Sequence, residues 1–98
     1  MRVAAVGDNC IDIYKEQNRY YPTGNCVDFA VNIRKLGVEV TVVSLTGTDH
    51  YGDELIEMLK KYDVDASHLH RKEGKTGTVL MQLVGNDRLH TISDPGVF

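Results

Sequence analysis

Residues 38–45 constrain the fold of this 98-residue chain more than any other segment. Their sequence, Val-Glu-Val-Thr-Val-Val-Ser-Leu, is mostly apolar and β-branched, which is typical of a strand covered on both faces in a parallel sheet. Residues 2–6 are a second short apolar run, ended by Gly7. Two parallel strands that lie side by side must be joined by a crossover connection. The segment between residues 2–6 and residues 38–45 is therefore expected to contain one.

Two helices are predicted from the spacing of apolar residues. Residues 24–36 form the first, and Gly37 follows where a left-handed cap is expected. Its predicted buried positions are Cys26, Phe29, Ala30, Ile33 and Leu36. Asp49 is the predicted N-cap of the second helix, whose apolar positions are Tyr51, Leu55, Met58, Leu59 and Tyr62. With a short third parallel strand at residues 67–70, the alternation predicts an α/β fold with a mainly parallel, Rossmann-like sheet.

Two hairpins interrupt this alternation. Residues 11–14 and 19–21 make the first, and residues 76–84 and 88–92 flank the turn sequence Gly85-Asn86-Asp87 in the second. We expect these lid strands, near 11–21 and 76–92, to form a small sheet standing off the main one. Its expected apolar face carries Tyr14, Tyr20, Tyr21, Val79, Met81 and Leu83. That face either packs on its own domain or forms a homodimer contact.

Composition limits the partners and the location. The chain has 11 Lys and Arg against 14 Asp and Glu and no basic run, which argues against nucleic acid. The apolar start is too short for a signal peptide or a membrane span, so the sequence predicts a cytoplasmic protein and no membrane partner. Cys10 and Cys26 are predicted to be free thiols, with a disulfide as the alternative. His68 and His70 suggest a solvated strand face rather than a metal site.

Two polar clusters are expected to meet at the carboxyl end of the first strand. Asp8, Asn9 and Asp12 follow that strand, and Gly24-Asn25 opens the first helix. Ligands of open α/β sheets bind beyond the carboxyl ends of the strands. A carboxylate can accept two hydroxyl groups, and a helix start offers free N–H donors, so the pattern predicts a pocket for a polyol. The alternative is that these residues only cap turns and begin the helix.

Three motifs resemble, in order, the amino-terminal half of the PfkB (ribokinase-like) carbohydrate kinases. They are Gly7-Asp8-Asn9-Cys10-Ile11-Asp12-Ile13-Tyr14, Thr23-Gly24-Asn25, and Gly47-Thr48-Asp49-His50-Tyr51-Gly52. Residues 62–69, 76–78 and 85–88 also resemble the segments that lead into and form the family's lid. The first motif is most similar to the family's kinases of glycated amino acids. The resemblance implies a ribokinase-like fold, of which residues 1–98 are the amino-terminal, acceptor-binding portion.

The resemblance also implies a set of substrate-binding residues. Asp12 would bind sugar hydroxyls, Gly24 and Asn25 would line the same pocket, and Cys10 belongs to the set. Asp28 stands where the family usually has a sugar-contacting Asn, and its charge would favour a substrate with extra hydroxyl or ammonium donors over a plain sugar. Thr23 stands where Gly is usual, so if that position needs a positive φ, either Thr23 is strained or the loop differs.

The activity implied is transfer of the γ-phosphoryl group of ATP, with Mg²⁺, to a hydroxyl of a sugar or glycated amino acid. In this family the catalytic base and the nucleotide pocket lie in the carboxyl-terminal half, so we expect no catalytic residue and no activity in this chain alone. A Gly-x-x-x-x-Gly-Lys-Ser/Thr loop is absent from its sequence. Two other classes stay open: a free-standing sugar-binding module or subunit, and a small Rossmann-like nucleotide-binding domain, which the missing Gly-x-Gly-x-x-Gly weakens.

Overall fold

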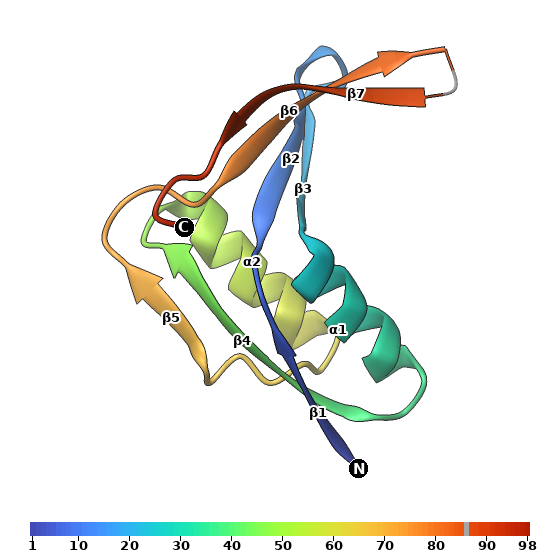
Figure 1. Cartoon of the computed structure of the whole chain (residues 1–98), viewed down its shortest axis with the longest axis vertical. Helices are drawn as coiled ribbons and strands as arrows, with labels where there is room; N and C mark the ends of the chain where they lie inside the picture. Colours follow the sequence, from blue (N-terminus) through green and yellow to red (C-terminus); the bar gives the residue numbers. More distant parts are fainter. Residues whose placement is uncertain (86) are drawn as a thin grey trace.

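The computed structural model describes residues 1–85 and 87–98, with side chains in that range other than those of 84 and 88–91. The elements in chain order are β1 (Arg2–Val6), β2 (Cys10–Tyr14), the 3-10 helix η1 (Lys15–Gln17), β3 (Arg19–Thr23), α1 (Asn25–Lys35), β4 (Glu39–Gly47), α2 (His50–Lys61), β5 (Leu69–Lys72), β6 (Thr78–Val84) and β7 (Asp87–Asp94). They form two sheets, and the second stands off one end of the first (Figure 1).

The first sheet has the strand order β1-β4-β5, and both pairings are parallel. Helix α1 leads into β4, and α2 connects β4 to β5. This arrangement confirms the predicted α/β fold with a mainly parallel sheet. Strand β5 begins two residues later than predicted, because Ser67 N–H donates to Asp65 Oδ1 at 2.9 Å and residues 65–68 turn before the strand starts.

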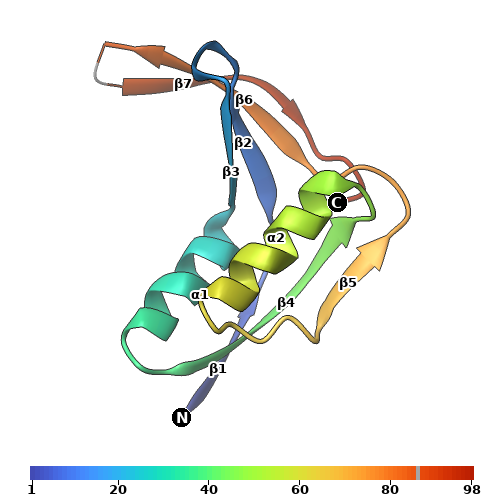
Figure 2. The same cartoon turned by 180° about the vertical axis from the view of Figure 1, so that it is seen from behind.

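Both helices pack on the same face of this sheet (Figure 2). A single apolar core joins Ala5 of β1 to residues of β4, α1 and α2, and its other principal members are Val40, Val42, Cys26, Val27, Ala30, Leu55 and Leu59. The positions that alternate with Ala5 along β1, Ala4 and Val6, are exposed. The prediction that residues 38–45 are covered on both faces is therefore wrong for the part of the chain described, because the two helices cover one face.

The buried stripe of α1 differs from the predicted one. Cys26 and Ala30 are buried as expected, but Phe29 is 50% exposed and Leu36 is 78% exposed. Val27 is completely buried in place of Phe29. A buried stripe through Phe29 and a buried stripe through Val27 both fit helical spacing. In the structure the helix is rotated about its axis so that Val27 and Ala30, one turn apart, face the sheet.

The predicted helix caps are confirmed. The Asp49 side chain accepts a hydrogen bond from Gly52 N–H at 3.0 Å, which is N-cap geometry. Gly37 follows α1 with φ of +87°, a left-handed conformation that glycine adopts without steric cost.

The second sheet is the predicted lid, with the strand order β3-β2-β6-β7. Antiparallel pairs join β2 to β3 and β6 to β7, and a parallel pair joins β2 to β6. Both predicted hairpins are thus confirmed and belong to one sheet. In the predicted turn, Asn86 lies outside the described residues, and Gly85 has φ of +61°.

Candidate functional site

The loop of residues 7–9 passes from one sheet to the other and is held at the carboxyl end of β4. Asn9, only 4% exposed, donates through Nδ2 to Ser44 Oγ and to Leu45 O, both at 2.8 Å. Ser44 Oγ in turn donates to Gly7 O at 2.6 Å. These bonds fix the point at which β2 leaves the main sheet. The role of Ser44 was not predicted, because in the sequence it is one residue of a mostly apolar strand.

Gly24 brings the amino terminus of α1 against the same loop. It is the N-cap of the helix and has φ of +118°. A Cβ atom at this position would lie 2.8 Å from Asn9 Cα and 2.9 Å from Asp8 O, so a larger residue does not fit. The predicted meeting of the two polar clusters is therefore confirmed.

Of the two alternatives for Thr23, strain or a different loop, the structure shows no positive φ at this residue. Thr23 is the last residue of β3 and pairs with Cys10 of β2, and the positive φ falls on Gly24 instead. Residues directly opposite in an antiparallel pair point to the same face of the sheet. Thr23 therefore shares a face with Cys10, and its hydroxyl lies 3.0 Å and 2.9 Å from the two carboxylate oxygens of Asp28.

Three carboxylates influence the half-buried thiol of Cys10. Burial, followed by the negative charges of Asp12, Asp8 and Asp28, raises the pKa of Cys10 to about 11. Its Sγ also donates to Asp12 Oδ1 at 3.8 Å. We call this set, Asp8, Cys10, Asp12 and Asp28, the acidic junction. It concentrates negative charge where the lid, the loop and the start of α1 meet, and it keeps the thiol protonated near neutral pH.

The face of the lid that carries Asp12 continues away from the main sheet. Tyr21 lies opposite Asp12 across the β2–β3 pair, and the Tyr14 and Tyr21 rings make an edge contact with centroids 5.8 Å apart. A hollow of about 210 Å³ is lined there by Tyr14, Gln17, Arg19, Tyr21 and Leu83. The acidic junction is thus adjoined by a face with both aromatic and polar side chains.

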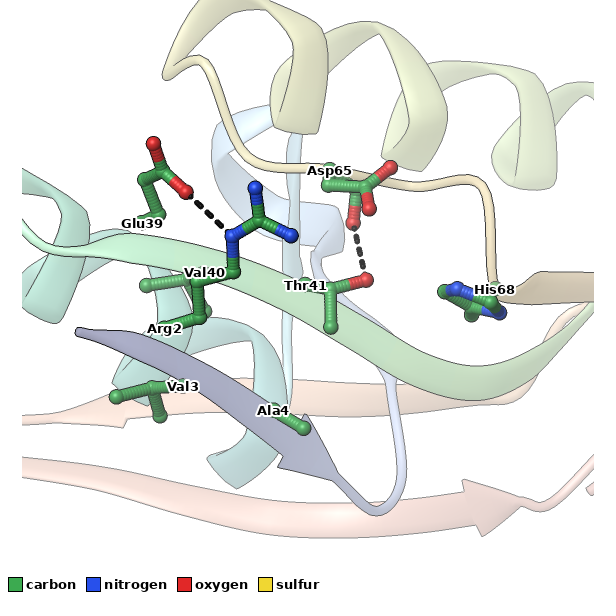
Figure 3. Close-up of a pocket in the computed structure, with 8 residues that line it drawn as sticks. All are labelled: Arg2, Val3, Ala4, Glu39, Val40, Thr41, Asp65 and His68. Carbon is green, nitrogen blue, oxygen red and sulfur yellow. Dashed lines mark hydrogen bonds and ion pairs between the residues drawn. The ribbon is translucent and has the colours of Figure 1, made fainter.

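A larger hollow, of about 440 Å³, lies at the opposite end of the main sheet (Figure 3). It includes the exposed ion pair between Arg2 and Glu39, at 2.9 Å, and the backbone of Asp65, which accepts from Thr41 Oγ1 at 3.3 Å. Because ligands of parallel sheets bind beyond the carboxyl ends of the strands, this hollow is at the wrong end for such a site.

A contact between the lid and α2 was not predicted. Tyr20 on β3 donates its hydroxyl to Glu54 Oε1 at 2.5 Å, and the Tyr20 hydroxyl oxygen also lies 3.3 Å from His50 Nε2. The hydrogen bond to Glu54 raises the pKa of Tyr20. Its ring also makes an edge contact with Tyr51, with centroids 5.2 Å apart. The spacing of His50 and Glu54 on one helix face was the only signal in the sequence, and it did not identify Tyr20 as the partner.

The remaining candidate groups are placed as follows. Cys10 and Cys26 are free, as predicted, and Cys26 Sγ donates to Ala5 O at 3.1 Å. His68 and His70 are exposed. Within residues 1–85 and 87–98, no cluster of three or more His, Cys, Asp or Glu side chains has an arrangement that could hold a metal ion. Neither helix of the described chain has the length and apolar character needed to cross a bilayer.

The chain is an α/β unit whose second sheet meets the main sheet at the acidic junction. The sequence comparison gives its family. Residues 2–96 match the pfkB family of carbohydrate kinases. The chain belongs to this family.

Individual relatives agree with that assignment. A fructoselysine 6-kinase of Escherichia coli is 38% identical over 87 residues, which are 89% of this chain and 33% of the relative. A fructosamine kinase of Bacillus subtilis is 33% identical over 97 residues, which are 98% of this chain and 34% of the relative. The structure of a sugar kinase from Pyrococcus horikoshii in complex with ATP has a TM-score of 0.80 at 30% identity, over 91% of this chain and 33% of that one. The chain therefore spans about a third of the length of these relatives.

Proposed function

We propose that this chain is the acceptor-binding part of an ATP-dependent kinase that phosphorylates a hydroxyl of a fructosamine such as fructoselysine. The observation that carries the proposal is the acidic junction, where Asp8, Asp12 and Asp28 gather around one neutral thiol. A fructosamine joins a polyhydroxy chain to a protonated amine. Carboxylates accept from hydroxyl groups and attract the cation, so one cluster suits both parts of the molecule.

Each residue of the proposed pocket has a separate task. Asp12 accepts hydrogen bonds from sugar hydroxyls, and its position on a strand keeps the carboxylate in place. Gly24 lets the helix start approach the loop of residues 7–9, and Asn25, exposed in the first turn of α1, offers an amide that donates and accepts. Cys10 supplies a neutral, half-buried wall, because its pKa of about 11 leaves it protonated. Asp28 attracts the ammonium group of the acceptor.

The nucleotide is not assigned to this part of the protein. ATP with Mg²⁺ is the proposed phosphoryl donor, and a related sugar kinase has been solved with ATP. In the described residues, however, there is neither a three-ligand acidic or histidine cluster for a metal nor a glycine-rich lysine loop for phosphates. We therefore derive no step of phosphoryl transfer from these residues.

Replacement of Asp12 tests the proposal directly. Asp12→Asn exchanges a charged acceptor for an amide of nearly the same shape, so we expect fructoselysine binding to weaken by about 1–3 kcal/mol. Isothermal titration of the 98-residue chain with fructoselysine and with fructose measures the change. Glu57→Gln is the control, because it removes one negative charge from an exposed position on α2.

This titration, together with an assay for ADP in the presence of ATP, separates the candidates. Loss of affinity in Asp12→Asn alone supports the proposed pocket. Equal affinities in the original chain and in both variants would remove Asp12 from the site. Sugar-dependent formation of ADP by the chain itself would contradict the assignment of the chemistry to another part of the protein. The alternative, a sugar-binding module without catalysis, predicts tight binding and no formation of ADP in any longer form of the protein.

A homodimer through the lid strands is the second part of the proposal. Tyr21 and Leu83 are each about half exposed on the lid, which leaves apolar surface for a second copy. Met81 and Tyr20 do not belong to that surface, contrary to expectation. Met81 is only 5% exposed and packs within the chain. Tyr20 lies opposite Ile13, on the other face from Tyr21, and contacts α2.

Leu83→Glu is therefore the variant that tests the dimer. A carboxylate on each copy would repel its counterpart, so we expect the mass measured by light scattering to fall from dimer to monomer with the circular dichroism spectrum retained. A variant with the same mass as the original chain would contradict a lid interface.

A further inference from the structure

The hydrogen bond between Thr23 and Asp28 links the lid to the helix that carries the proposed cation site. Thr23 ends β3, and Asp28 lies in the first turn of α1. The single hydroxyl hydrogen of Thr23 is shared between Asp28 Oδ1 at 3.0 Å and Oδ2 at 2.9 Å. Such a shared bond places the hydroxyl between the two oxygens, so it restricts rotation of the carboxylate and leaves the outer side of each oxygen for another donor.

The charge of Asp28 remains available for a ligand. Thr23 is a neutral partner, and the ion pairs found among the described side chains do not include Asp28. Asp28 is exposed, whereas the threonine that holds it is half-buried. Threonine is also stiff at χ1, because two heavy atoms branch from its Cβ. The arrangement joins a fixed donor to an accessible anion.

We infer that Thr23 is a positioning residue that sets the preference of this site for a cationic acceptor over a neutral sugar by orienting the Asp28 carboxylate. The inference rests on the function proposed above. An oriented carboxylate loses less rotational freedom when it pairs with an ammonium group, so binding of the cationic acceptor gains from the Thr23 bond. A neutral sugar has no ammonium group, and Asp12 rather than Asp28 is its proposed partner.

The test compares the affinities of the 98-residue chain for fructoselysine and for fructose. Thr23→Val keeps the branched shape and removes the hydroxyl, so we expect the ratio of the two affinities to fall by about five- to tenfold, with fructose binding changed by less than about twofold. Thr23→Ser retains the hydroxyl and should restore the original ratio. Thr41→Val is the matched control, since it removes a strand hydroxyl bonded to Asp65 O at the other end of the sheet.

A double variant separates positioning from a simple structural role. If Thr23 acts through Asp28, Thr23→Val should change the affinity ratio little once Asp28→Asn is present, because the oriented charge is already gone. Equal losses for both ligands in Thr23→Val, or a ratio that Thr23→Ser fails to restore, would overturn the inference while leaving the acceptor pocket intact. Absence of binding of either ligand to the unaltered chain would instead overturn the proposed function, and the inference with it.

Discussion

Gly24→Ala is expected to destabilise the folded chain by about 3 kcal/mol, because strain and steric overlap act together at this position. The φ of +118° is unfavourable for any residue with a side chain, and the new Cβ would lie 2.8 Å from Asn9 Cα and 2.9 Å from Asp8 O. Both contacts are with backbone atoms, which cannot move aside as the end of a flexible side chain can. Urea denaturation followed by circular dichroism measures the loss.

Gly37→Ala is the matched control for this experiment. Gly37 also has a positive φ, of +87°, but an added Cβ there would meet nothing within 4 Å. Its cost should therefore be the backbone strain alone, about 1 kcal/mol. The excess cost at Gly24 then measures the close approach of α1 to the loop of residues 7–9. Equal losses in the two variants would contradict the tight junction on which the proposed pocket depends.

Asp49→Ala is expected to destabilise the chain by a similar amount, about 3 kcal/mol, because one carboxylate holds three donors. Asp49 Oδ1 accepts from Gly52 N–H at 3.0 Å and from Thr76 Oγ1 at 2.7 Å, and Oδ2 accepts from Thr76 N–H at 3.0 Å. The residue thus caps α2 and also anchors the segment that enters β6. Asp53→Ala is the control, since among the described side chains Asp53 pairs with Arg71 in an exposed ion pair, and its loss should cost less than about 1 kcal/mol.

The same network predicts how stability depends on pH. Burial tends to raise the pKa of Asp49, but the hydrogen bonds from Thr76 and Gly52 outweigh it and leave the pKa below its ordinary value of 3.8. A carboxyl group with a lowered folded pKa stabilises the protein fully above the unfolded pKa, and this contribution is lost as the pH falls through 3.8 toward the folded value. The difference in unfolding free energy between the original chain and Asp49→Ala should therefore shrink below about pH 4. A difference that is constant from pH 6 to the acid limit would contradict a carboxylate role.

Features set by local turn chemistry or by a general rule of sheet topology were predictable from the sequence. The cap at Asp49, the positive φ at Gly37 and the meeting of Asp8 and Asn9 with the start of α1 follow from turn chemistry and from the rule on strand ends. The rotation of α1 was not predictable, because Phe29 and Val27 fit helical spacing equally well and only packing against the sheet distinguishes them.

Contacts between distant segments account for the rest. Tyr20 and Glu54 are 34 residues apart, and Thr76 and Asp49 are 27 apart, so neither pair has a local signature. Strain at Thr23 was one of two alternatives, and it required the positive φ of the helix start to fall at that residue. In the structure Gly24 has the positive φ, and Thr23 lies in a strand, where its hydroxyl donates to the Asp28 carboxylate.

The contact of Tyr20 with α2 provides the chain with an optical reporter. The sequence has five tyrosines and no tryptophan, so its emission comes from tyrosine alone when the exciting light is of a wavelength that phenylalanine does not absorb. Tyr14, Tyr20 and Tyr21 all lie on the lid, and Tyr20 donates its hydroxyl to the Glu54 carboxylate. A carboxylate that accepts from a phenol alters the emission of that phenol. Movement of the lid away from α2 would break this bond, so it can be followed by the intrinsic fluorescence of the unlabelled protein.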